Sequence, residues 1–198
     1  MFTQESERYS DRDELSLEIK RQVFHLFLIL LWCVPINHFP YQLTLLIFST
    51  VIAVNLLVVY RYEPLIGLFH RFIVELEREK NLSRPGIQAL YANLGIFLSY
   101  ILFGKLSLLG VVILAVGDSF STLIGKVFGR HELFFNPEKT WEGTLSFFLS
   151  VYIVLLLWVG FEKALLLSCI ASIVEAMRLK VDDNFLVPVI VTSLAYLM

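Results

Sequence analysis

The sequence predicts an all-α integral membrane protein with about seven transmembrane helices and one amphipathic helix at the membrane surface. Of its 198 residues 57% are hydrophobic, and the mean hydropathy is +0.73, well above the balance of a soluble domain. The apolar residues form separate runs long enough to cross a bilayer, divided by short polar turns. No internal repeat or low-complexity segment divides the chain, so we expect one domain over residues 1–198.

The expected helices follow from the apolar runs in chain order. Residues 1–17 are polar and of mixed charge, and we expect them to form a loose arm that becomes helical near Leu15. The first three spans are expected over residues 18–35, 43–60 and 87–103. The fourth is the apolar run that carries Asp118, and the fifth covers residues 144–159. The sixth ends near Glu175, and the seventh runs from about residue 182 to the end. Between the second and third spans, residues 64–80 have one apolar face and predict a helix lying on the membrane.

The basic residues predict the orientation of these spans. With seven spans, 16 Lys and Arg residues divide so that only Lys105 and Lys163 lie on the side opposite the N-terminus. The positive-inside rule therefore places the N-terminus in the cytoplasm and the C-terminus on the opposite side. Every acidic residue except Glu162 also falls on the cytoplasmic side, so a charged substrate is expected to come from the cytosol.

The stretch from Gly117 to Gly143 carries the most informative polar residues. Asp118 lies within an apolar run, and small or polar residues follow it at helical spacing on the same face, namely Ser119, Ser121, Thr122, Gly125 and Gly129. A carboxylate in the middle of a membrane helix costs on the order of 3 kcal/mol, so it is expected to face a polar cavity, a partner or an ion.

Cations and hydroxyl groups come directly after this face. Lys126, Arg130 and Lys139 are candidate phosphate-binding residues, and Lys139 begins the motif KTWEG, which contains Thr140, Glu142 and Gly143. Carboxylates that hold a divalent ion, cations that bind phosphate, and glycines that allow close approach are what phosphoryl or nucleotidyl transfer to a lipid requires. Two simpler interpretations stay open, because the cations also satisfy the positive-inside rule and glycines often serve only to pack membrane helices.

Four segments resemble the dolichol kinase family, the membrane kinases that include phytol kinases and yeast-type diacylglycerol kinases. The segments are GDSFSTLIGKVFGRHEL, KTWEG, VEAM and DDNFLVPVI. Glu18, Arg21 and His25 are also similar to early acidic, basic and histidine positions of that family, although Gln22 stands where a second base is usual. The resemblance extends from Glu18 to Pro188, and it implies transfer of the terminal phosphate of CTP to a lipid alcohol with a divalent cation, Mg²⁺ or Ca²⁺.

Residue roles follow from the motifs and the resemblance together. The expected catalytic residues are Asp118, Lys139, Glu142 and Asp183. The expected nucleotide-binding residues are Gly117, Ser119, Gly125, Lys126, Gly129, Arg130, Thr140, Gly143 and Asn184. The expected metal ligands are Asp118, Asp182 and Asp183, and the further site residues are Glu18, Arg21, His25 and Glu175. Lys139 and Asp183 are far apart in the sequence, and we expect them to converge at the cytoplasmic face.

Two other functions compete with the kinase. Phosphatidate cytidylyltransferases also resemble the chain around Asp118 and NPEKTWEG and also use CTP, but their usual SPKKT reads NPEKT here, and their glycine-rich, aspartate-bearing C-terminal signature is absent. A small ion-coupled transporter would explain Asp118 and Glu175 but would leave the basic loop unused. We expect CTP, a lipid alcohol and membrane lipids as partners, and no nucleic acid. Which lipid alcohol is used and the oligomeric state stay open.

Overall fold

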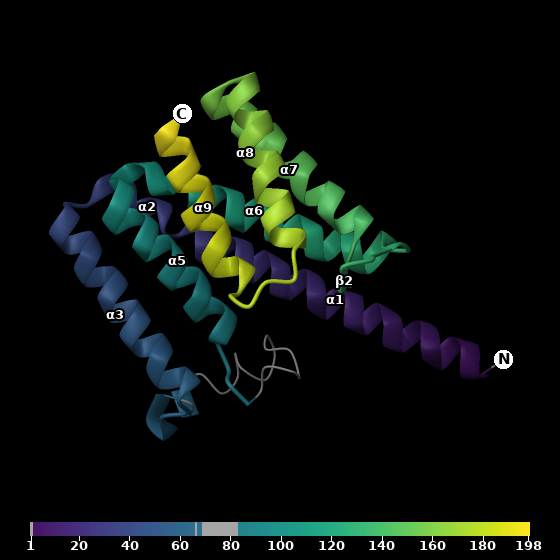
Figure 1. The fold of residues 1–198 in the computed structure, drawn as a ribbon. Helices are drawn as coiled ribbons and strands as arrows, with labels where there is room; N and C mark the ends of the chain where they lie inside the picture. The colour runs from purple at the N-terminus through teal and green to yellow at the C-terminus, as the bar shows by residue number, and fades with distance from the viewer. Residues whose placement is uncertain (1, 66, 69–82) are drawn as a thin grey trace.

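The computed structural model is a helical bundle with one short hairpin of strands (Figure 1). It describes residues 2–65, 67–68 and 83–198, with side chains from Leu15 onward. In chain order the elements are α1 (Phe2–Leu30), α2 (Cys33–His38), α3 (Tyr41–Val59), α5 (Ile87–Phe103), η2 (Gly104–Leu106), α6 (Ser107–Phe128), β1 (Glu132–Leu133), β2 (Asn136–Thr140), α7 (Trp141–Val159), α8 (Phe161–Ala176) and α9 (Asp183–Leu197). This architecture confirms the all-α class. The surface helix expected over residues 64–80 falls largely outside the described residues.

Each predicted span coincides with a helix, but the number of membrane crossings stays a prediction. By length and composition, four described helical stretches can cross a membrane: Leu15–His38, Tyr41–Val59, Ile87–Phe128 and Trp141–Val159. The 42-residue stretch contains both α5 and α6. Gly104 divides them at a φ of 57°, a left-handed conformation that glycine adopts without steric cost.

The expectation that the arm becomes helical only near Leu15 is wrong, because α1 is helical from Phe2. Polar composition suggested an unstructured segment. However, neither glycine nor proline occurs between Phe2 and Leu30, so nothing interrupts the helix that the apolar residues further along establish.

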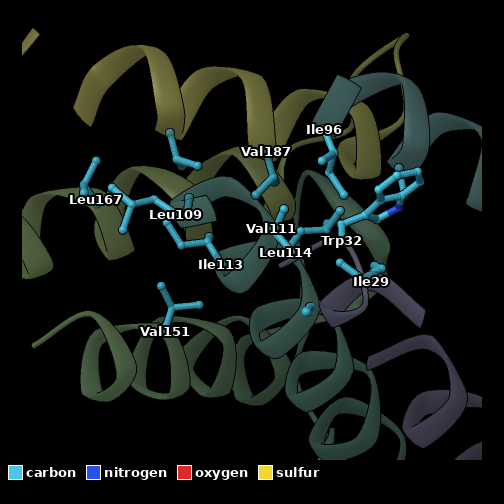
Figure 2. Packing of buried hydrophobic residues seen from close by; sticks show 14 of the residues in the cluster. Ile29, Trp32, Ile96, Leu109, Val111, Ile113, Leu114, Val151, Leu167 and Val187 are labelled. Atoms are coloured by element: carbon cyan, nitrogen blue, oxygen red, sulfur yellow. The ribbon is translucent and has the colours of Figure 1, made fainter. Parts of the chain in front are cut away.

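Helix α6 lies at the centre of the bundle. Its residues Val111, Ile113 and Leu114 are at most 2% exposed, and Figure 2 shows them packed against Val151 of α7 and Val187 of α9. Lipid tails are as apolar as these side chains, so close packing rather than escape from water holds such helices together. The faces turned away from α6 carry large exposed apolar side chains, among them Leu46, Ile153 and Leu157. Such an apolar exterior suits contact with lipid.

Two glycines let α9 pack between α5 and α6. A Cβ atom at Gly95 of α5 would lie 2.9 Å from Pro188 Cγ, and one at Gly110 of α6 would lie 2.9 Å from the Pro188 carbonyl oxygen. Pro188 is buried, and α9 continues through it. Because Gly95 and Gly110 lie on either side of the Gly104 turn, α5 and α6 form a hairpin that holds α9.

Candidate active site

Polar side chains from α1, α6, β2, α7, α8 and α9 line one cavity of about 1880 Å³. Most of the residues predicted to form the site line it. They are Glu18, Arg21, His25, Asp118, Gly125, Lys126, Lys139, Thr140, Gly143, Glu175, Asp182, Asp183 and Asn184. Segments from both ends of the chain therefore contribute to one polar region.

Lys139 joins three elements inside this cavity. Its Nζ lies 2.8 Å from Glu175 Oε1 of α8 and forms an ion pair with Asp183 Oδ2 of α9. The predicted meeting of the Lys139 and Asp183 side chains is thus confirmed, and its placement at the cytoplasmic face stays a prediction. Burial alone would lower the pKa of Lys139, but the charges of Glu175 and Asp183 outweigh burial and hold the pKa above its usual value. Lys139 is therefore a cation throughout the physiological pH range.

The β-hairpin brings Lys139 to the cavity. Strands β1 and β2 pair antiparallel, with Glu132 opposite Thr140. The Asn136 side chain donates a hydrogen bond of 3.0 Å to the carbonyl oxygen of Ala176, which ties β2 to the end of α8. Thr140 then caps α7, its Oγ1 accepting from the Gly143 N–H at 3.2 Å. Lys139 thus lies between a fixed strand and a fixed helix start.

Asp182 fixes the start of α9 in the same way. Its Oδ1 accepts from the backbone N–H of Asn184 at 3.0 Å and from the Asn184 side chain at 2.8 Å. Burial raises the pKa of Asp182, and the charges of Asp183 and Asp118 raise it further. Carboxylates from α6, from α9 and from the residue that caps α9 therefore share one electrostatic environment.

Helices α1 and α6 meet through two polar contacts. His25 Nε2 lies 3.0 Å from Asp118 Oδ2. Nearer the basic loop, the fully buried Glu18 lies with its Oε2 3.1 Å from Lys126 Nζ and 3.6 Å from an Arg21 nitrogen. A buried carboxylate requires such partners. Glu18, Arg21 and His25, which the helical spacing placed on one face, all line the cavity wall.

Gly125 and Gly143 let α6 and α7 approach each other beside the cavity. A Cβ atom at Gly143 would lie 2.9 Å from the Ser121 carbonyl oxygen and 3.4 Å from Gly125 Cα. These two glycines therefore serve packing, and they also line the cavity, so the predicted approach of phosphate to them stays a prediction.

Five predicted residues do not line the cavity. Gly117 lies against the Phe147 ring, and Ser119 is buried with its Oγ 3.4 Å from the Gln22 carbonyl oxygen. Gly129 and Arg130 follow α6, and Arg130 is exposed. Glu142 pairs with His131 of the preceding loop at 2.6 Å, a contact that fastens this loop to α7. These five residues are not part of the catalytic set proposed below.

Several polar residues of the cavity were not predicted from the sequence as site residues. Ser121 was placed on the Asp118 face but given no role, and its Oγ donates to Glu175 Oε1 at 3.2 Å. The Gln22 side chain donates a hydrogen bond of 2.9 Å to Glu18 Oε1. Its amide thus contacts Glu18 from the position where a second basic residue was expected. Asn55 of α3 also lines the cavity. An amide within an apolar run was the available signal for Asn55.

The side-chain oxygen atoms that line the cavity are of the type that binds a divalent cation. As they stand, no three His, Cys, Asp or Glu side chains of the described residues are close enough to hold a metal ion. Glu175 Oε2 and Asn184 Oδ1, however, are buried without a hydrogen-bond partner, and both residues line the cavity. Hard divalent cations prefer such carboxylate and amide oxygens.

Charge also favours a cation here. Among the described residues that line the cavity, carboxylates outnumber Lys and Arg side chains. The carboxylates are Glu18, Asp118, Glu138, Glu175, Asp182 and Asp183, and the cations are Arg21, Lys126 and Lys139. A further anion entering this space would meet net negative charge unless a cation came with it.

Comparison with known proteins finds several relatives of the chain. No protein-family model and no solved structure matches the chain. A dolichol kinase of Schizosaccharomyces pombe is 30% identical over 91% of the chain, and a dolichol kinase of Saccharomyces cerevisiae is 32% identical over 90%. The chain spans only 40% and 36% of these two proteins.

Two further relatives match different lengths of the chain. An uncharacterized protein of Methanocaldococcus jannaschii is 32% identical over 88% of this chain and 90% of its own length. A probable phytol kinase of Triticum aestivum is 29% identical over 63% of the chain. By these similarities, the chain is related to the dolichol kinases over about nine-tenths of its own length.

Proposed function

We propose that this protein is a membrane kinase that transfers the terminal phosphate of CTP to the hydroxyl of a lipid alcohol. The observation that carries the proposal is the cluster of Lys139, Glu175 and Asp183 in the same cavity as Asp118. It supplies a permanent cation for phosphate and carboxylates for a metal ion within one space. CTP as the donor rests on the resemblance to the family.

Lys139 is the proposed phosphate-binding residue. Without nucleotide its charge is balanced by Glu175 and Asp183. When a triphosphate enters, the ammonium group turns from these carboxylates to the terminal phosphate, a movement that a flexible lysine side chain allows. Asp183, one of the two carboxylates it leaves, becomes available as a ligand. Asp118, Asp182 and Asp183 would hold Mg²⁺ or Ca²⁺, which neutralises phosphate charge when bound.

The transfer itself is a displacement at phosphorus. The alcohol oxygen forms a bond to the γ-phosphorus, the bond to the β-phosphate oxygen breaks, and CDP leaves. The alcohol proton passes to a carboxylate of the cavity. Lys139 counteracts the negative charge that spreads over the transferring oxygens, and the fixed starts of α7 and α9 hold Lys139 and Asp183 in place for this step.

The reaction is proposed to occur at the cytoplasmic face. The two basic residues expected on the other side support this placement, because both lie at the other end of the bundle. Lys105 is in η2, beside Trp158 and Val159 at the end of α7, and Lys163 is in the first turn of α8. The cavity cations lie toward the opposite helix ends.

The test is transfer from CTP labelled separately in its γ-phosphate and its cytidine. Purified protein in detergent is incubated with Mg²⁺ or Ca²⁺ and a panel of polyprenol, dolichol, phytol-type alcohol, diacylglycerol and phosphatidate. γ-Phosphate label on an alcohol supports the kinase. Cytidine label on phosphatidate would replace it with a cytidylyltransferase. Folded protein that labels no lipid from CTP or any other nucleoside triphosphate would overturn the proposal.

A further inference from the structure

The cavity has a second, apolar part that the phosphate chemistry does not use. We call it the apolar arm, and it is lined by Phe24, Leu28, Leu31, Val34, Phe39, Val51 and Val54. These residues come from α1, α2, α3 and the turns that flank α2. The arm is continuous with the polar part that holds Asp118 and Lys139, because one cavity includes both.

The arm faces sideways between α1 and α3. Its seven lining side chains are between 36% and 49% exposed, although all are apolar. Over their described residues α1 packs mainly on α6, α3 packs mainly on α5, and α1 and α3 share no extensive contact. Figure 1 shows the two helices diverging on either side of α2. An apolar molecule in the bilayer can therefore reach the arm laterally.

Helix α5 forms the back of the arm. Its Asn93 accepts a hydrogen bond of 2.9 Å from Trp32 Nε1 and donates one of 3.3 Å to Asn55 Oδ1 of α3. These bonds tie α3 and the turn after α1 to α5, and all three residues line the cavity. Because the amides bond to each other at the back, the arm offers an apolar front to a ligand.

The arm begins where the reactive groups lie. His25 is one residue from Phe24 of the arm, and its Nε2 lies 3.0 Å from Asp118 Oδ2. Along α1 the helical rise from His25 to Leu31 is about 9 Å, and the arm continues to Phe39. A chain lying in the arm would point its polar end at Asp118 and its other end toward lipid.

We propose that the apolar arm binds the hydrocarbon tail of the acceptor alcohol, which enters from the bilayer between α1 and α3. This inference rests on the proposed kinase function and adds where its acceptor binds. A tail in the arm excludes water from one side of the site and orients the hydroxyl toward the terminal phosphate. Because a longer tail buries more apolar area in the arm, a longer chain should lower the KM for the alcohol.

Val51→Trp tests the assignment. Val51 faces the arm from α3 and is 37% exposed, so the larger ring fits without disturbing the core and blocks the tail. The matched control is Leu46→Trp, on the same helix at a position 63% exposed and outside the cavity lining. We expect Val51→Trp to raise the KM for a long-chain alcohol by about tenfold or more, and to leave turnover of a five-carbon alcohol within about twofold of the unsubstituted protein.

A second measurement does not depend on turnover. A long-chain alcohol with a photoreactive tail should label the α1 and α3 residues of the arm in the unsubstituted protein, and Val51→Trp should reduce this labelling while Leu46→Trp should not. Equal effects of both variants, or labelling confined to other faces, would overturn the inference even if transfer is observed. Failure of the unsubstituted protein to phosphorylate either alcohol would instead count against the kinase function, and labelling of the arm would still report tail binding.

Discussion

Replacing Lys139 by methionine should destabilise the protein, because Lys139 neutralises buried acid. The Glu175 side chain is 6% exposed, and Lys139 Nζ lies 2.8 Å from its Oε1. Removing one partner of a buried ion pair leaves an uncompensated charge and typically costs about 3–5 kcal/mol. For a chain of this length each kcal/mol lowers the Tm by about 2–4 °C, so we expect a loss of about 6–20 °C.

A second substitution separates charge from lost packing. Glu175→Gln removes the carboxylate charge that Lys139→Met leaves without its partner. The double variant Lys139→Met with Glu175→Gln should therefore have a Tm close to that of the unsubstituted protein. The control is Lys163→Met, an exposed lysine at the other end of the bundle, which should change the Tm by little. Thermal unfolding of each purified variant in detergent gives these values. An unchanged Tm in Lys139→Met, or a double variant no more stable than the single one, would refute the charge argument.

Four further outcomes are expected. Asp118→Asn should leave the protein folded and lower divalent-dependent transfer by about a hundredfold, and retained transfer with the same metal requirement would contradict its role. Gly117→Ala should destabilise by about 1–3 kcal/mol because its Cβ would lie 2.4 Å from Phe147 Cζ, whereas Gly67→Ala, where a Cβ meets no atom of the described residues within 4 Å, should not. Chelating divalent cations should weaken CTP binding by about tenfold or more, as measured by calorimetry, since carboxylates outnumber cations in the cavity. Single cysteines at Glu138 and Lys163, in a background lacking Cys33 and Cys169, should be labelled from opposite sides of the membrane, and labelling from one side would exclude the expected topology.

The helices could be predicted because their causes are local. Apolar runs of sufficient length and the glycine or proline turns between them locate α3, α5, α7 and α9 within a few residues. The β-hairpin was not foreseen, because β1 has two residues and the connecting Phe134 and Phe135 carry no turn signal such as Asn-Gly. The start of α1 at Phe2 was also not predicted. The polar composition of the first residues suggested disorder, although no glycine or proline there breaks the helix.

The candidate site was predictable in its residue types and not in its contacts. An aspartate in an apolar run is costly wherever it occurs, so the sequence alone was enough to single out Asp118. The pairing of Lys139 with Glu175 depends on how β2 meets the end of α8, and the Asn136 bond to Ala176 that fixes this meeting joins residues 40 positions apart. Helical periodicity relates only neighbours three or four positions apart and cannot give such a contact.

The pairing changes how the lysine is understood. The sequence predicted Lys139 as a phosphate-binding cation close to Asp183, and the structure shows that it also pairs with Glu175. In the proposed mechanism, a triphosphate would therefore replace Glu175 and Asp183 as the partner of the Lys139 ammonium group. The two carboxylates would then repel the negative charge of the triphosphate, unless a divalent cation neutralised them. Nucleotide and cation should for this reason enter the cavity as one unit, with Lys139 exchanging carboxylate for phosphate as they do. In the proposed mechanism, this exchange would make phosphate binding and metal binding a single coupled event, controlled by Lys139 and its two acids together.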